Sequence, residues 1–273
     1  ANDIYQGVLD GVADIGLSCF SYTRGRFPVL EVFELPGIVY NSAEVASKVA
    51  WEGIKILRPE EIQDTRLMMV LATGSGDLFA KEAIRNLKDL RGMELRATGL
   101  SARTLDMLGA IPIAMAQSEA YEALSKGMVK GNLAPVEVLK GWKHAEVTKY
   151  LTKTPFLYNT LFFLTMNLEK WNSLPSHIQR AIEDVNERCF YEIAAGLWDK
   201  QNEDALNWAV NEMGMEIIEL SEEEMLMWIR RVEPIHKEYT KKLNKRGLNG
   251  REILDTVKQL AEKYNKGMAD GGR

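Results

Sequence analysis

The chain has 273 residues and 46% of them are apolar, which is enough to bury a large core in one big domain or two medium ones. Its 34 Lys and Arg against 39 Asp and Glu give a net charge of -5, so we expect no broad basic surface for nucleic acid or anionic lipid. No run of about 18 apolar residues occurs, and we therefore expect no membrane-embedded segment.

Cysteine and histidine usage argues against a metal centre. Cys19 and Cys189 belong to no cluster with metal-ligand spacing, and two separate buried thiols are favoured over a disulfide between them. None of the three histidines has zinc-like spacing. We expect neither a cofactor nor a metal site.

Short apolar runs alternate with capped helical segments along the chain, a pattern typical of α/β layers. Strands are predicted at 12–20, 66–72, 93–97, 111–115, 131–134, 147–151, 157–166 and 215–220. Helices are predicted at 42–51, 101–109 and 118–127, after Pro135, and at 221–247 and 251–264. The segment 73–76 (TGSG) reads as a loop near a hinge.

The segment from Pro175 to about Met213 predicts an unusually long helix, because it has no internal proline and one glycine, Gly196. Such a helix would be roughly 55 Å long, more than the ~30 Å diameter of a small domain, so it should brace two domains. The alternative is two helices broken near Gly196, although a single glycine is tolerated inside a helix.

Several stretches together resemble the solute-binding proteins of tripartite ATP-independent periplasmic (TRAP) transporters. They are GVADIGLSCFSYTRGRFPVLEVFELP (11–36), NLKDLRGMELRATG (86–99), LGAIPIAMAQSEAYEALSKGMVKGNLAP (108–135), EVTKYLT (146–152) and WNSLP (171–175). The order and spacing match over essentially the whole chain.

The resemblance implies an α/β, two-lobed periplasmic binding protein, with mixed sheets flanked by helices and one long helix spanning both lobes. Lobe I would comprise 1–73 and 160–199, and lobe II 74–159 and 200–273. Such a protein works in the periplasm, encloses a small organic carboxylate in the cleft and delivers it to membrane subunits without chemistry. Ligand contacts from both lobes would favour the closed state.

Two features depart from the family pattern. Members usually open with a further strand, helix and strand, whereas this sequence begins after them, with Ala rather than Met, as a processed or trimmed form would. The usual Val-Asp-Gly reads Val129, Lys130, Gly131, and we expect this change to leave the ligand class unaltered.

Arg96 is the strongest candidate for ligand binding. The resemblance implies that the arginine ending GMELR forms a bidentate pair with the ligand's carboxylate, which a planar fork of N–H donors matches. The alternative is a surface arginine paired with a neighbouring Asp or Glu. If Arg96 binds the ligand, Arg96→Ala should cost about 2–5 kcal/mol of binding.

Further candidates come from strand ends and turns of both lobes. They are Tyr22, Ser18, Cys19, Phe20, Thr73, Ser75, Thr98, Gln117, Asn132 and Phe156. Ordinary core packing is the alternative for Tyr22 and for Ser18, Cys19 and Phe20. A nucleophilic Cys19 is not expected, since no histidine lies nearby in sequence. Phe156 favours a small, partly apolar acid, such as a 2-oxo or branched-chain acid.

Three other classes were weighed against this interpretation. A periplasmic enzyme would need a nucleophile–base pair or paired carboxylates, and the sequence has no Ser-His-Asp motif and no G-x-S-x-G elbow, so we expect no enzyme. A ligand-binding sensor domain would share the fold and the site. A binder from an ATP-driven uptake system would lack the long bracing helix.

Overall fold

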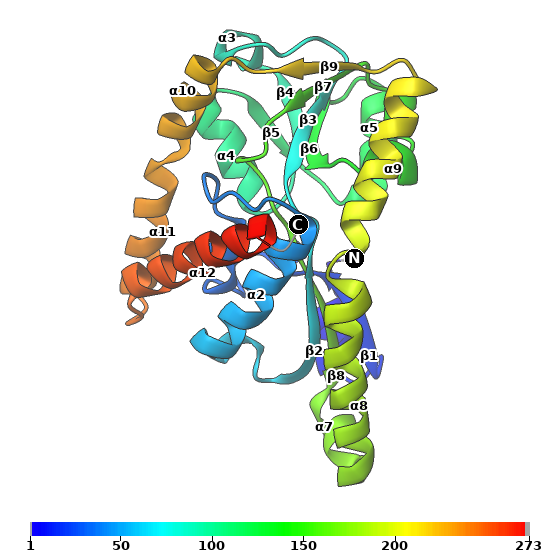
Figure 1. Ribbon diagram of the computed structural model, residues 1–273, viewed down its shortest axis with the longest axis vertical. Helices are drawn as coiled ribbons and strands as arrows, with labels where there is room; N and C mark the ends of the chain where they lie inside the picture. The colour runs from blue at the N-terminus through cyan, green and yellow to red at the C-terminus, as the bar shows by residue number, and fades with distance from the viewer. Residues whose placement is uncertain (1, 271–273) are drawn as a thin grey trace.

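The computed structural model describes residues 2–270, and side chains up to residue 267. Its strands form two sheets, each in a lobe of its own (Figure 1). Lobe I carries a three-stranded antiparallel sheet in the order β1 (Ile15–Cys19), β8 (Leu161–Asn167), β2 (Thr65–Ala72). The predicted strands are present with shifted ends.

Lobe II carries a six-stranded mixed sheet. Its order is β5 (Ile111–Ala114), β4 (Glu94–Ala97), β6 (Gly131–Pro135), β3 (Gly76–Ala80), β7 (Tyr150–Lys153), β9 (Glu216–Glu219). β4 lies parallel to both β5 and β6, whereas β3 is antiparallel to β6 and β7. The sequence analysis did not predict strand β3. It treated 73–76 as a loop and assigned no element between that loop and the strand at 93–97.

Two connections between the lobes run side by side. Thr73 N–H, just after β2, donates to the Thr160 carbonyl at 3.1 Å. Gly76 N–H donates to the Tyr158 carbonyl at 3.3 Å. Gly74, at φ +74°, lies so close to Ala43 that a Cβ would be 2.9 Å from its backbone. The predicted loop is therefore a tightly packed part of a paired hinge.

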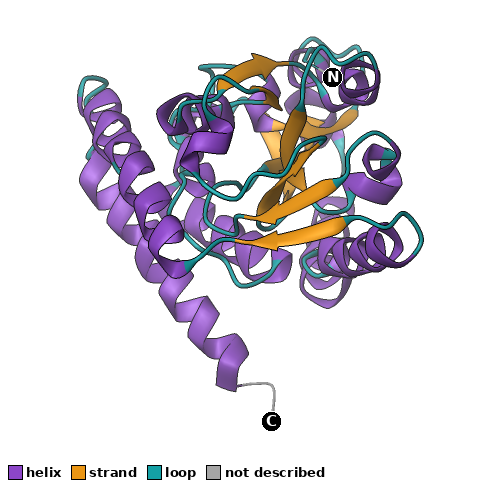
Figure 2. Cartoon of the chain, turned by 90° about the horizontal axis from the view of Figure 1, so that it is seen from above, coloured by secondary structure: helices purple, strands orange, loops and turns teal. Residues whose placement is uncertain are grey.

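Helices cover both sheets (Figures 1 and 2). The α-helices besides the long segment below are α1 (Ile4–Leu9), α2 (Ala43–Leu57), α3 (Leu87–Leu90), α4 (Leu100–Leu108), α5 (Gln117–Ser125), α6 (Val138–Gly141), α7 (Leu168–Ser173), α10 (Glu222–Val232), α11 (Pro234–Asn244) and α12 (Gly250–Asp270). Single 3-10 turns are η1 (Phe20–Tyr22), η2 (Leu30–Glu34), η3 (Glu60–Ile62) and η4 (His144–Glu146).

Several predicted helix ends were wrong. Helix α2 continues through Gly53 instead of ending there. A Cβ at this position would be 2.6 Å from the ring of Phe33, so the glycine makes room for that ring rather than ending the helix. Pro135 ends strand β6 rather than opening a helix. The single helix predicted for 221–247 is two helices, and the second begins at Pro234, which supplies no N–H to continue the first.

The long helical segment consists of α8 (Ser176–Cys189), a π-helical turn η5 (Phe190–Ala194) and α9 (Leu197–Asn211). Helix α8 packs on β2 in lobe I, and α9 packs on α6 in lobe II, so the segment spans both lobes as predicted. The helix is interrupted at Gly196, which was the alternative left open. A π-helical turn inserts one extra residue per turn and is a recognised cause of a bend.

The C-terminal helices return to lobe I. Helix α12 packs along α2. On α11, the Tyr239 hydroxyl donates to the Val29 carbonyl at 3.0 Å, and Lys242 pairs with Glu31 at 2.7 Å. The lobe boundaries at 73/74, 159/160 and 199/200 stay a prediction, and α11 and α12 lie against the lobe to which that scheme does not assign them.

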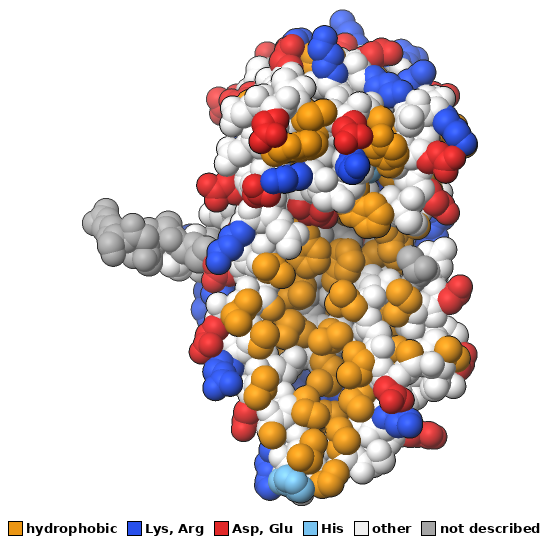
Figure 3. Space-filling view, turned by 90° about the vertical axis from the view of Figure 1, so that its right-hand side faces the viewer, with side chains coloured by type: hydrophobic (Ala, Val, Ile, Leu, Met, Phe, Trp, Pro, Cys, Tyr) orange, Lys and Arg blue, Asp and Glu red, His pale blue; other side chains and the backbone are white. Residues whose placement is uncertain are grey.

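Lobe I has a broad apolar face (Figure 3). Its exposed apolar side chains come from the start of the chain and from the long helical segment: Val12, Ile15, Leu17, Ile178, Val185 and Ile193. Three of these side chains, Ile178, Val185 and Ile193, belong to the long helical segment and face outward rather than into a core.

Candidate functional site: a buried guanidinium between the lobes

Arg96 lies near the end of β4, between β5 and β6, and its side chain is 2% exposed. Its Nε and Nη2 donate to the Met115 carbonyl at 3.1 and 3.0 Å, and Nη1 donates to Asn132 Oδ1 at 3.4 Å. These bonds use three of the five N–H groups of a guanidinium. Among the described side chains no carboxylate forms an ion pair with Arg96, so the surface-pair alternative is wrong.

Two amides and an imidazole extend this polar cluster. Asn132, on β6 and fully buried, has its Nδ2 3.1 Å from His144 Nδ1. The other ring nitrogen, His144 Nε2, lies 3.0 Å from Gln117 Nε2 at the start of α5. Burial and the nearby charge of Arg96 lower the pKa of His144 to about 4, so the imidazole is neutral at neutral pH.

The lobes touch at two places beside this cluster. Tyr22, on η1, accepts a hydrogen bond of 3.1 Å at its hydroxyl from the backbone N–H of Gln117 in lobe II. Gly99, directly before α4, packs so closely on lobe I that a Cβ there would be 2.5 Å from Ser21 Cβ. The lobes are therefore closed over the cluster.

Two groups from lobe I complete the electrostatic surroundings. The pKa of the Cys19 thiol is raised to about 12, mainly by burial and in part by Glu34, while the hydrogen bond with Ser21 and the charge of Arg96 oppose the rise. Glu34 likewise raises the pKa of the buried Tyr158, and Arg96 lowers it. Burial raises the pKa of Glu34 itself to about 8, despite the bond that its carboxyl accepts from Leu161 N–H at 2.9 Å. The cluster thus holds one permanent charge at neutral pH, on Arg96.

The family model for bacterial extracellular solute-binding proteins, family 7, matches residues 1–242. The chain belongs to this family. It is a solute-binding protein of the TRAP type, as the sequence motifs indicate.

Curated relatives and solved structures agree with this membership. The C4-dicarboxylate-binding periplasmic protein DctP of Rhodobacter capsulatus is 27% identical over 84% of this chain and 67% of its own length. A TRAP solute-binding protein of Rhodoferax ferrireducens, solved with benzoate, is 28% identical with a TM-score of 0.90 over 97% of this chain and 84% of that one. A marine metagenome protein solved with 3-hydroxybenzoate is 32% identical, with a TM-score of 0.90 over 97% and 83%. This chain spans about two thirds of the length of the curated relative.

Four of the predicted site residues form two directly contacting pairs, Arg96 with Asn132 and Gln117 with Tyr22, and His144 connects the pairs. Cys19 lies at the edge of this group, its Sγ 3.2 Å from Ser21 Oγ. Both cysteines are free thiols, so the disulfide alternative is wrong.

The other candidates are held by other partners. Thr73 Oγ1 donates to the Gly74 carbonyl, and Ser75 Oγ donates to the Tyr40 carbonyl, both at the hinge. Phe20 packs on Phe27 and Phe163. Ser18, Thr98 and Phe156 are buried. Ligand contact by these six residues stays a prediction.

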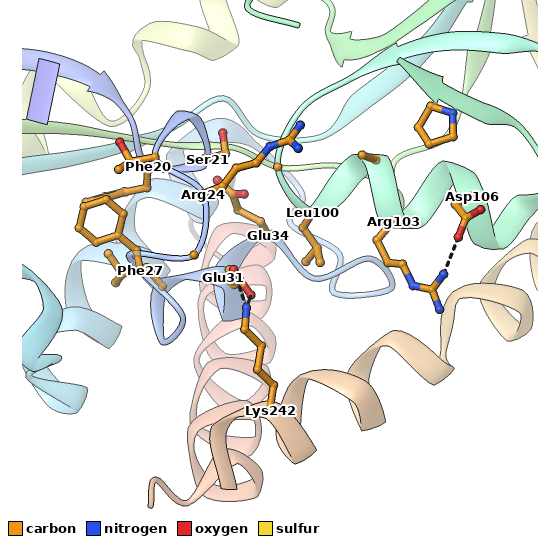
Figure 4. A pocket seen from close by; sticks show the side chains of 16 residues that line it. Phe20, Ser21, Arg24, Phe27, Glu31, Glu34, Leu100, Arg103, Asp106 and Lys242 are labelled. Carbon is orange, nitrogen blue, oxygen red and sulfur yellow. Dashed lines mark hydrogen bonds and ion pairs between the residues drawn. The ribbon is translucent and has the colours of Figure 1, made fainter. Parts of the chain in front are cut away.

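A cavity of about 490 Å³ lies beside the cluster, between η1 and η2 of lobe I and α4 of lobe II (Figure 4). Ser21, Glu34 and Gly99 line it, but Arg96 does not. Along its edge Lys242 pairs with Glu31, and Arg103 pairs with Asp106. We take the buried guanidinium as the candidate site, because four of the six charged side chains that line this cavity already pair with each other.

Sequence reasoning missed His144 and Glu34. His144 was considered only as a metal ligand, and it lies in a short turn whose sequence carries no signal of its position. Glu34 lies inside the quoted motif 11–36, where an acidic residue amid Val32, Phe33 and Leu35 could have indicated a buried carboxyl.

No helix in the described part of the chain is long and apolar enough to cross a membrane. Nor do the described residues contain a group of three or more His, Cys, Asp or Glu side chains that could hold a metal ion.

Proposed function

We propose that this protein captures a small monocarboxylic acid with an apolar body between its two lobes and delivers it to the membrane subunits of a TRAP transporter. The observation that carries the proposal is the guanidinium of Arg96, which is 2% exposed and has no carboxylate partner among the described side chains.

A buried charge without a counter-ion is costly, so such a group is retained where a ligand supplies the counter-charge. Three N–H groups of Arg96 are held by Met115 and Asn132, which fixes the plane of the guanidinium. The remaining two can meet the two oxygens of one carboxylate. Tyr22, whose hydroxyl lies beside Arg96, would be displaced toward the ligand or share the contact.

The charges favour one carboxylate rather than two. Arg96 is the only buried Lys or Arg among the described residues, so a second carboxylate would find no second buried cation. Tyr22, Tyr158 and the buried Phe156 suit an apolar body. The structural relatives solved with benzoate and 3-hydroxybenzoate support an aromatic acid, and 2-oxo and branched-chain acids belong to the same class.

Capture without chemistry agrees with the state of the reactive groups. Cys19 is protonated at neutral pH, because its pKa is raised to about 12, and the pKa of His144, lowered to about 4, makes it a poor base. We place the protein in the periplasm because the relative from Rhodobacter capsulatus is described as periplasmic and because the family is extracellular.

Calorimetric titration of the purified protein with four acids tests the proposal: benzoate, 2-oxoisovalerate, succinate and glucuronate. We expect benzoate or 2-oxoisovalerate to bind more tightly than the dicarboxylate and the sugar acid. Tightest binding of succinate would contradict the monocarboxylate assignment, and tightest binding of glucuronate would contradict the apolar body.

A further inference from the structure

Four polar side chains form one continuous chain of contacts in lobe II. Arg96 Nη1 contacts Asn132 Oδ1, Asn132 Nδ2 contacts His144 Nδ1, and His144 Nε2 contacts Gln117, at 3.4, 3.1 and 3.0 Å. His144 is 0% exposed, so its two ring nitrogens have no access to water. Each contact therefore needs one donor and one acceptor.

The atom that carries the proton in each contact can be deduced from Arg96, because a guanidinium can only donate hydrogen bonds. The Asn132 atom that faces Arg96 is consequently the carbonyl oxygen, and its NH₂ group donates to His144 Nδ1. A ring nitrogen that accepts carries no proton. Because the imidazole is neutral, its single proton lies on Nε2.

A protonated Nε2 must find an acceptor on Gln117, and the amide of Gln117 has one, Oε1. In its present orientation the amide places Gln117 Nε2 3.0 Å from His144 Nε2. Two donors would then face each other with no acceptor between them. Turning the amide by 180° places Oε1 against His144 and turns the NH₂ group away from it. That NH₂ group has no other partner among the hydrogen bonds of the described residues.

We propose that His144 is a positioning residue for ligand recognition: it holds the Gln117 amide with its NH₂ group free to donate to the bound acid. The inference rests on the proposed function. Gln117 is suited to this role because its backbone N–H already contacts Tyr22, the residue that closes lobe I over Arg96. With Arg96, Tyr22 and Gln117 all offering donors, the site is matched to a group that only accepts, as a carboxylate does.

The first test needs no ligand. Long-range ¹H–¹⁵N NMR on the ligand-free protein should show His144 as the Nε2-protonated tautomer, with no titration between pH 5 and 8. An Nδ1-protonated ring, or a ring that takes up a second proton in this range, would overturn the inference.

The second test is a double-mutant cycle of His144→Phe and Gln117→Met, with the dissociation constant for benzoate measured by calorimetry. Each single change should weaken binding by about tenfold, the effect of one lost hydrogen bond to a charged group. In the Gln117→Met background, His144→Phe should weaken binding by less than about threefold. Equal effects in both backgrounds, or a lower melting temperature with unchanged affinity, would show that His144 is only structural.

The two hypotheses fail in different ways. A wild-type protein that binds no acid in the panel overturns the proposed function and this inference together. A wild-type protein that binds benzoate, while the two substitutions show no coupling, overturns the role of His144 alone.

Discussion

The hydroxyl of Tyr22 accepts a hydrogen bond of 3.1 Å from the backbone N–H of Gln117, and this bond joins lobe I to lobe II. Tyr22 lies beside Arg96, whose side chain lowers the pKa of Tyr22 against the rise caused by burial. The Tyr22 hydroxyl therefore makes the contact between the lobes and also lies next to the Arg96 guanidinium. When a ligand brings the lobes together, the bond between Gln117 and Tyr22 adds to the stability of the complex. A ligand that holds the lobes apart prevents this bond from forming.

Removing the Tyr22 hydroxyl should weaken binding without unfolding the protein. For Tyr22→Phe we expect a roughly three- to tenfold higher dissociation constant for benzoate, since one hydrogen bond of the closed state is lost. The melting temperature of the ligand-free protein should fall only slightly, because one hydrogen bond contributes about 0.5–1.5 kcal/mol to stability. Tyr121→Phe is the matched control, as its exposed hydroxyl donates to Glu146 within lobe II. Equal affinities for Tyr22→Phe and wild type would contradict a role in closure.

Replacing Arg96 should separate binding from stability. Arg96→Met keeps most of the side-chain volume and removes the charge, so binding should lose about 2–5 kcal/mol, at least roughly thirtyfold in affinity. Ligand-free stability should change little, because the cost of an unpaired buried charge is removed together with its hydrogen bonds. Calorimetry measures the loss of binding, and thermal unfolding measures the stability of the ligand-free protein. Arg251→Met, which removes an exposed cation paired with Asp255 within α12, is the control. An affinity that survives Arg96→Met would refute the carboxylate assignment.

Much of the fold could be predicted because local signals agree with it. Strands β2, β4 and β5 follow apolar runs, and Ser221 caps α10 as its spacing with Glu224 predicts. The contacts among Arg96, Asn132, Gln117 and Tyr22 join residues that the family motifs had singled out. The family motifs include residues from both lobes. Hydrophobic periodicity alone could not predict that these residues come together in the fold.

What sequence could not predict depends on long-range packing. His144 enters the site from a turn, and only the fold places it between Asn132 and Gln117. The bend at Phe190–Ala194 has no proline, so its helical pattern looks uninterrupted. Gly53 fails as a stop signal because Phe33, twenty residues earlier in the chain, needs the space.

Closure should be sensitive to the small gap between Gly99 and Ser21. Gly99→Ala strains the backbone at φ +54° in both open and closed states, but its Cβ meets Ser21 only when the lobes close. We expect about 1–3 kcal/mol weaker binding from this overpacking, beyond any fall in melting temperature. Gly127→Ala is the control, since Gly127 also has positive φ, at +72°, and has open space around it.

Ser21→Gly in the Gly99→Ala background should restore affinity, because it removes the atom that the new Cβ would meet at 2.5 Å. The melting temperature should not recover, since the backbone strain persists. Calorimetry on the single and double variants measures this rescue. A double variant as weak as Gly99→Ala would mean that backbone strain, rather than the contact between lobes, limits binding.

Glu34 should make the protein less stable as the pH rises. Its pKa is raised from 4.5 to about 8 by burial, so between these values the folded state holds a proton that the unfolded state has released. The stabilisation is fully present below pH 4.5 and is lost as the pH rises through 8. Glu34→Gln imitates the neutral acid and still offers an oxygen to Leu161 N–H, so it should remove this part of the pH dependence. Urea unfolding at pH 5, 7 and 9 measures the difference.

Other buried carboxyls also titrate in this range, since the pKa of Glu61 is raised to about 7 and that of Asp77 to about 6. The informative quantity is therefore the free energy of unfolding of Glu34→Gln minus that of wild type at each pH. We expect this difference to grow by a few kcal/mol from pH 5 to pH 9. Glu203→Gln, at an exposed position on α9, should give a flat difference. A flat difference for Glu34→Gln as well would mean that its carboxyl is already ionised at pH 5 or is reached by water in the folded protein.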